Sequence, residues 1–101
     1  MAETRDAIIN AIKDLISKNE GSYSDYYVGI TDDPEKRLFE DHEVSKNGVY
    51  DYWEAMSADS ARAVEKYCID QLNTDGGTGG GDDYSKYVYV YEKTSYTDEE
   101  T

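Results

Sequence analysis

The sequence contains very little cysteine. Cys68 is the only cysteine among the 101 residues, which excludes a disulfide within the chain and a zinc site built from cysteines. No apolar run reaches the length of about 18 residues that a membrane-spanning helix needs, and the N-terminus lacks the basic-then-apolar pattern of a signal peptide. These absences suit a reducing compartment, so we expect a soluble, cytoplasmic protein that does not enter a membrane.

Large aliphatic side chains are also scarce. Ile, Leu, Val and Phe account for only 16 of the 101 residues, a proportion that by itself is typical of disordered chains. Eleven tyrosines and one tryptophan offset this scarcity, because each ring carries a large apolar area together with one polar atom. We therefore predict one folded domain over residues 1–96 with a tyrosine-rich core, followed by a frayed acidic tail at 97–101.

Positive charge is the third scarcity. Ten lysines and arginines stand against 23 aspartates and glutamates, which gives a formal net charge of −13. A charge of this sign repels phosphate backbones and disfavours general electrostatic steering to nucleic acid. A role on nucleic acid or on another phosphodiester therefore requires a local site that is neutral or positive. A basic protein surface is the partner that the overall charge favours.

Apolar residues spaced three or four apart predict the first helix, and a cap followed by a proline predicts the second. The first spans residues 4–20 and ends before Gly21, since a glycine just past the last turn can take a left-handed conformation. The second spans about 34–42. An aspartate precedes it as a cap, and Pro34 suits its first position because the missing N–H has no partner inside a helix.

The third predicted helix carries the most informative single residue outside the region around Tyr27. It begins after Ser57 and ends near Leu72 or Asn73. Glu65 falls within its apolar face, where a carboxylate costs free energy unless it finds a partner or a metal ion.

Alternating residues predict three strands, at 26–31, 49–55 and 87–92. In the first strand, Tyr27 and every second residue after it share one face. In the last strand, we expect the valines to face the core and the tyrosines to face a second, more polar surface. The pattern predicts an α+β fold, in which a mainly antiparallel three-stranded sheet is flanked by about three helices.

A glycine-rich loop at 75–83 separates the third helix from the last strand. It is not a phosphate-binding loop of the Walker type, because no Lys-Ser/Thr pair follows it. Two interpretations stay open: a long flexible connection, or a backbone that a ligand approaches closely.

One stretch of the chain resembles the central motif of the GIY-YIG nuclease superfamily. Tyr27-Val28-Gly29 matches the "YIG" strand of that motif, and Arg37 lies ten residues beyond Tyr27, on the helix where the family carries its essential arginine. Glu65 lies on a later helix in the local setting of the family's metal-binding glutamate. The resemblance covers about residues 26–73 and implies a divergent GIY-YIG-like domain.

This resemblance implies an endonuclease-like hydrolysis of phosphodiesters that depends on Mg²⁺ or Mn²⁺. By analogy with the family, Tyr27 positions or deprotonates the attacking water, and Glu65 holds the divalent metal ion on the scissile phosphate. Arg37 neutralises the charge that develops on the phosphoryl oxygens. His42 assists proton transfer, which makes it the fourth candidate catalytic residue.

Each of these residues also has a structural interpretation. Tyr27 fits a core position, and His42 fits a surface position near a helix C-terminus. Arg37 can pair with Asp41 on the same helix or can neutralise Glu65. The family's Gly-Ile-Tyr strand is absent upstream of Tyr27, and together with the net charge this favours a second class of function. That class is a catalytically silent acidic binding or inhibitor protein on the same scaffold, with a basic protein surface as its partner.

Overall fold

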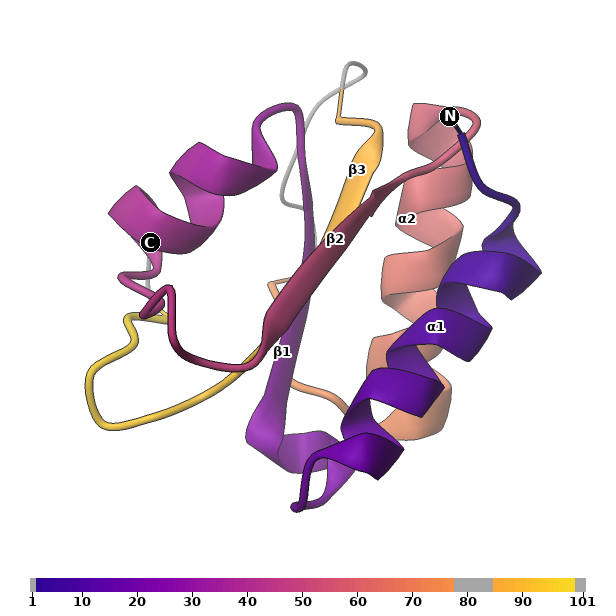
Figure 1. Ribbon diagram of the computed structural model, residues 1–101. Helices are drawn as coiled ribbons and strands as arrows, with labels where there is room; N and C mark the ends of the chain where they lie inside the picture. Colours follow the sequence, from indigo (N-terminus) through magenta and orange to yellow (C-terminus); the bar gives the residue numbers. More distant parts are fainter. Residues whose placement is uncertain (1, 78–84, 100–101) are drawn as a thin grey trace.

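A computed structural model describes residues 2–77 and 85–99, which form an α+β fold around one antiparallel sheet (Figure 1). The strand order is β1 (Tyr26–Thr31), β3 (Tyr87–Glu92) and β2 (Tyr50–Glu54), so the last strand in the sequence lies at the centre. The predicted fold class is confirmed. The strand predicted at 49–55 is one residue shorter at each end.

Two long helices cover one face of the sheet side by side (Figure 1). Helix α1 spans Arg5–Lys18, and helix α2 spans Ala58–Tyr67 and continues as the wider helical turn η3, Cys68–Leu72. Side-chain oxygens cap both N-termini, from Thr4 in α1 and from Ser57 in α2. Their apolar stripes and the inner side of the sheet form a core that we call the aliphatic face: Ile8, Ile12, Ile16, Tyr26, Val28, Ile30, Ala55, Ala61, Val64, Cys68, Val88 and Val90.

The ends of the helices depend on asparagines rather than on Gly21. Helix α1 stops because Asn19 turns to an extended conformation, and its side-chain amide donates a 2.8 Å hydrogen bond to the carbonyl of Leu15. Gly21 takes a positive φ of +116°, but it lies beyond this end and does not cap the helix. Asn73 takes the left-handed conformation, with φ of +66°, and ends η3 where the sequence predicted.

A short helix, η2 (Lys36–Asp41), lies on the other side of the sheet (Figure 1). Asp33 caps it, because its carboxylate accepts a 3.2 Å hydrogen bond from the backbone N–H of Lys36. Under η2 the sheet buries a second core, which we call the tyrosine face: Tyr27, Leu38, Val44, Tyr89 and Tyr91, with Phe39, Tyr50 and Tyr52 packed against it.

The tyrosines of β3 therefore do not form the more polar surface that the sequence predicted. Tyr89 is 1% exposed and Tyr91 is fully buried, because η2 and the C-terminal segment cover them. The backbone N–H of Asp98 donates a 2.7 Å hydrogen bond to the carbonyl of His42, and the hydroxyl of Tyr91 donates a 2.8 Å hydrogen bond to the Glu99 carboxylate. Asp98 and Glu99 are thus fixed against the tyrosine face, in contrast to the frayed tail expected there.

No helix within residues 2–77 and 85–99 is long and apolar enough to cross a membrane.

Candidate active site

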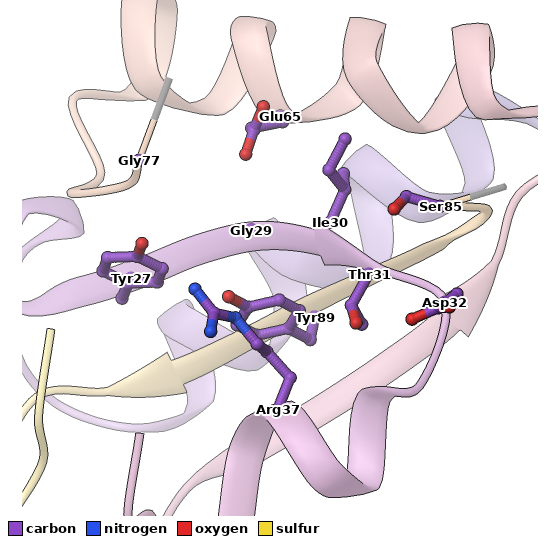
Figure 2. Close-up of a pocket in the computed structure, with 10 residues that line it drawn as sticks. All are labelled: Tyr27, Gly29, Ile30, Thr31, Asp32, Arg37, Glu65, Gly77, Ser85 and Tyr89. Carbon is purple, nitrogen blue, oxygen red and sulfur yellow. The ribbon is translucent and has the colours of Figure 1, made fainter. Parts of the chain in front are cut away.

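A cavity of about 180 Å³ opens along the outer edge of β1, which is an edge strand of the sheet (Figure 2). Three of the four candidate residues, Tyr27, Arg37 and Glu65, line this cavity, whereas His42 does not. The described residues that line it are Tyr27, Gly29, Ile30, Thr31, Asp32, Arg37, Glu65, Gly77, Ser85 and Tyr89.

The cavity lies where the two faces of the sheet meet. Helix α2 packs on the aliphatic face, yet Glu65 reaches from it toward the edge of β1 (Figure 2). Arg37 reaches the same edge from η2, on the tyrosine face, and its guanidinium points toward Tyr27 and Tyr89 (Figure 2). Side chains from opposite layers therefore share one cavity around an edge strand.

Gly29 in the Tyr-x-Gly motif has a steric reason to be a glycine. It pairs with Tyr89 across β1 and β3, and a Cβ atom at position 29 would overlap the hydroxyl and ring of Tyr89. Without that atom, the ring of Tyr89 lies close over β1, and its hydroxyl hydrogen-bonds with Arg37 and with His42.

The start of the glycine-rich loop pairs with the same strand. The backbone of Asp75 accepts a 2.9 Å hydrogen bond from the N–H of Val28 and donates a 2.8 Å one to the carbonyl of Tyr26. A Cβ atom on Gly76 would lie 2.6 Å from the carbonyl oxygen of Val28. The close approach at Gly76 is thus to the chain's own strand β1, and residues 78–83 of the loop lie outside the described residues.

Arg37 is the one basic residue among those that line the cavity. Its guanidinium forms a 3.0 Å ion pair with Asp41, one of the two pairings that the sequence left open, and it also hydrogen-bonds with Tyr89. The hydrogen bond from Arg37 lowers the pKa of the Asp41 carboxyl. The alternative pair between Arg37 and Glu65 is not formed, and the guanidinium carries its positive charge into the cavity.

Glu65 is the uncompensated charge of the site. It is only 7% exposed, and no hydrogen bond or ion pair to its carboxylate occurs within 2–77 and 85–99. Burial raises the pKa of this carboxyl to about 7, and the nearby charge of Arg62 offsets only part of the effect. At neutral pH Glu65 is poised between its protonated and charged forms, so a proton or a cation in the cavity would stabilise it.

Tyr27 presents a neutral phenol to the cavity. It is 5% exposed, and its hydroxyl accepts a hydrogen bond from the backbone N–H of Gly77. Burial raises the pKa of Tyr27, although the charge of Arg37 opposes the shift. Its ring packs on Tyr91 at a centroid distance of 5.3 Å and on His42 at 4.8 Å. The phenol is thus a core ring and a cavity-lining hydroxyl at the same time.

His42 lies behind the cavity and is fully buried, so the surface position considered from the sequence is wrong. Its Nε2 lies 2.7 Å from the hydroxyl of Tyr89, and its Nδ1 lies 2.6 Å from the carbonyl oxygen of Asp98. Burial lowers the pKa of the imidazole, despite the hydrogen bond with the backbone of Asp98, so the ring is neutral near pH 7. His42 contacts two residues that line the cavity, Tyr89 through a hydrogen bond and Tyr27 through ring packing.

The carboxylates that line the cavity can be compared with the ligands that a divalent cation needs. Within the described residues no cluster of three or more His, Cys, Asp or Glu side chains forms a metal cage. Mg²⁺ is commonly held by one or two carboxylates, with water and substrate phosphates completing its shell. Glu65, a buried carboxylate without a partner among the described residues, fits such an ion, and Asp32 is the second carboxylate among the described residues that line the cavity.

The sequence interpretation missed Tyr89, which lines the cavity and hydrogen-bonds with Arg37. The alternation of residues 87–92 put Tyr89 on the same face as Tyr91. In β1, Tyr27 and Gly29 share one face, and Gly29 pairs with Tyr89 in the antiparallel sheet. Recognising that pairing would have revealed Tyr89. Ser85 also lines the cavity and is 3% exposed, but no sequence pattern marks it.

Comparison of the chain with protein family models, with curated proteins and with solved structures gave no match.

Proposed function

We propose that this chain is a divalent-metal-dependent hydrolase of small phosphodiesters, built on a divergent GIY-YIG-like scaffold. The observation that carries the proposal is that Tyr27, Arg37 and Glu65 line one cavity at the edge of β1. A guanidinium, a neutral phenol and an uncompensated carboxylate are the groups that such a reaction needs to bind an anion, position water and hold a cation.

Arg37 binds the phosphodiester in this proposal. Its planar guanidinium suits two non-bridging oxygens of one phosphoryl group. Asp41 and Tyr89 hold the guanidinium from behind, which reduces the reorganisation that binding requires. Charge that builds up on the phosphoryl oxygens during the attack is neutralised at this side chain.

Glu65 holds the divalent ion. A bound Mg²⁺ or Mn²⁺ would neutralise phosphate charge and increase the acidity of a coordinated water. A bound cation would also stabilise the protein, because it offsets the free energy that the buried carboxylate of Glu65 costs. The same burial makes binding of the cation compete with a proton near neutral pH, since the pKa of Glu65 is about 7.

Tyr27 orients the attacking water. The N–H of Gly77 occupies one lone pair of its hydroxyl oxygen, so the phenolic proton and the second lone pair remain for water in the cavity. Because burial raises its pKa, Tyr27 acts as a neutral hydrogen-bonding group near neutral pH.

The substrate is small because the protein offers few cations beyond Arg37. Lys66 forms a 3.0 Å ion pair with Asp70, and Lys46 lies over the ring of Phe39. Neither lysine lines the cavity, and Arg37 is the one basic residue among the described residues that do, so the cavity itself offers no row of cations that could follow a nucleic acid backbone. We expect weak binding to duplex DNA at physiological salt.

The second candidate is the catalytically silent binding protein, and the net charge of −13 is the observation that favours it. In that case a basic protein surface meets the acidic surface of this chain, and association falls as salt rises. The cavity at β1 then has no catalytic role, and Glu65 contributes nothing to function.

A hydrolysis assay separates the two candidates. The substrates are bis(p-nitrophenyl) phosphate and short DNA and RNA oligonucleotides, each with Mg²⁺, with Mn²⁺ and with a chelator. We expect hydrolysis that needs the metal and falls on the order of 100-fold in Glu65→Gln. The matched control is Asp70→Asn, which removes an exposed carboxylate from η3 outside the cavity and should leave the rate unchanged. Metal-independent rates, or equal rates for both variants, would contradict the proposal.

A further inference from the structure

A line of hydrogen bonds joins the C-terminal segment to Arg37. The carbonyl oxygen of Asp98 lies 2.6 Å from Nδ1 of His42, and Nε2 of the same ring lies 2.7 Å from the hydroxyl of Tyr89. That hydroxyl also hydrogen-bonds with the guanidinium of Arg37. Two residues on the tyrosine face therefore separate the cavity from a segment that is 61 residues away from Arg37 in the sequence.

Donor and acceptor chemistry gives every proton in this line a definite place. A carbonyl oxygen only accepts, so Nδ1 of His42 carries the proton that is donated to Asp98. In the neutral ring Nε2 is then an acceptor, and the hydroxyl of Tyr89 donates to it. The Tyr89 oxygen is left to accept from Arg37, which has only donors. All three bonds point the same way, from Arg37 toward the C-terminal segment.

The C-terminal segment is held at His42 from two sides. Besides accepting from the ring, Asp98 donates its backbone N–H to the carbonyl oxygen of His42 at 2.7 Å. The neighbouring Glu99 accepts a hydrogen bond from Tyr91. Because the ring of His42 is fully buried, a lost partner could not be replaced readily by water.

We propose that His42 and Tyr89 are positioning residues for Arg37, and that the C-terminal segment, through Asp98, sets the orientation of the guanidinium in the cavity. The inference rests on the proposed function, in which Arg37 binds the substrate anion. It assigns His42 a role in orientation, behind the cavity wall, in place of direct proton transfer to the substrate.

Tyr91 offers a matched comparison. It lies two residues after Tyr89 on the same face of β3, it is buried, and its hydroxyl lies 3.2 Å from Nδ1 of His42. It does not line the cavity. Removal of the Tyr91 hydroxyl leaves the two hydrogen bonds of His42 that form the line, to Asp98 and to Tyr89, in place. Removal of the Tyr89 hydroxyl takes away the group that joins His42 to Arg37. A purely structural role would make Tyr89→Phe and Tyr91→Phe equivalent.

The experiment uses the full chain and inorganic phosphate as the probe. Nitrogen NMR of the wild type should show that His42 carries its proton on Nδ1 at pH 7. Tyr89→Phe should weaken phosphate binding about 10-fold, as expected for a lost hydrogen bond to a charged group, and should shift the Nε signal of Arg37. A chain that ends at Thr97, and so lacks Asp98, should do the same. Tyr91→Phe, which keeps the hydrogen bonds of His42 with Asp98 and Tyr89, should leave phosphate binding within about twofold of the wild type and shift the Arg37 signal much less than Tyr89→Phe does.

Two outcomes overturn the inference: a proton on Nε2 of His42, or equal effects of Tyr89→Phe and Tyr91→Phe. The tautomer is measured on the wild type, so this test survives even if a variant does not fold. Failure of the proposed function looks different. In that case the wild type does not bind phosphate, while the Arg37 signal still responds to Tyr89→Phe and to the shortened chain.

Discussion

The two faces of the sheet are buried by different chemistry. The aliphatic face packs Ile, Val and Ala side chains that make no directional bonds, whereas the tyrosine face buries rings whose hydroxyls and imidazole are joined by hydrogen bonds. Non-directional packing supplies stability in proportion to the area that it removes from water. Directional bonds add less stability but fix the positions of side chains. The candidate site lies at the edge of β1, and each face contributes one charged residue to it. Glu65 comes from the helix on the aliphatic face, and Arg37 comes from the helix on the tyrosine face.

The difference also explains how a chain with few aliphatic residues forms two cores. Buried tyrosines supply ring area, and each hydroxyl needs a partner if the burial is to be favourable. The hydroxyl of Tyr89 hydrogen-bonds with His42 and Arg37, and the hydroxyl of Tyr91 hydrogen-bonds with Glu99. One of these polar partners, Arg37, also lines the cavity, so the second core and the candidate site share a residue.

The largest expected effect comes from the aliphatic face. Ile12 is fully buried between α1 and the sheet, so Ile12→Ala should lower the free energy of unfolding by about 3 kcal/mol. Urea denaturation measures this loss. Ile9→Ala is the control, because Ile9 lies on the same helix but is only partly buried, and it should cost less. Equal costs would show that the aliphatic face does not carry the stability.

A methyl group at Gly29, where β1 pairs with β3, should have the next largest effect. Gly29→Ala places a Cβ atom against the ring of Tyr89, and the displacement should cost about 2 kcal/mol. It should also shift the NMR signals of His42 and Arg37, since Tyr89 hydrogen-bonds with both. Unchanged signals at these two residues would mean that Tyr89 does not join them.

Glu65→Gln should stabilise the protein, but only at high pH. In the folded state the pKa of Glu65 is raised to about 7 from its ordinary value of 4.5, so the folded protein binds more protons than the unfolded chain between these values. Stability therefore falls as pH rises from about 4.5 to 7, and the loss is complete above 7. Because the carboxylate borders an open cavity, we expect about 1.5 kcal/mol rather than the full value of the shift.

Unfolding free energies at pH 4 and pH 8 test this prediction. Glu65→Gln should exceed the wild type at pH 8 and match it at pH 4, where Glu65 is protonated. At pH 8 without metal, Mn²⁺ should stabilise the wild type and leave the variant unchanged. A variant that gains nothing at pH 8 would show that the Glu65 carboxylate is well hydrated.

The smallest effect should come from Arg37→Ala. Its ion pair with Asp41 is between side chains that are 28% and 30% exposed, and such a pair contributes about 0.5 kcal/mol. The lost hydrogen bond with Tyr89 adds to this, but Tyr89 keeps His42 as a partner, so the total loss should be about 1 kcal/mol. A buried pair between Arg37 and Glu65 would instead have made the substitution cost about 3 kcal/mol. Denaturant midpoints distinguish the two values, and a loss near the larger one would contradict the pairing described here.

The fold and part of the site followed from local patterns in the sequence. Alternation predicted the strands, and the interrupted apolar face of the third helix marked Glu65 as a buried carboxylate. The burial of His42 was not predictable, because it depends on Asp98, which is 56 residues away in the chain. The strand β3 looks amphipathic in the sequence, with its tyrosines on the more polar side. Their face becomes a core only because η2 and the C-terminal segment cover it.

The sequence also did not decide whether Arg37 forms its ion pair with Asp41 or with Glu65. Asp41 is available on the same helix by its spacing alone, whereas Glu65 requires two layers of the fold to meet at the edge of β1. The structure brings Glu65 to the cavity without forming that pair. Patterns of local spacing carry no information on such distances between layers.

The most direct measurement is a crystal structure of the wild-type chain grown with Mn²⁺ and a short, slowly hydrolysed phosphodiester analogue. Anomalous scattering locates the metal independently of the rest of the density. The proposed function predicts one Mn²⁺ on the Glu65 carboxylate and a phosphoryl group between that ion and the guanidinium of Arg37, with a water near the hydroxyl of Tyr27. A cavity that holds neither metal nor phosphoryl group at saturating concentrations would contradict it.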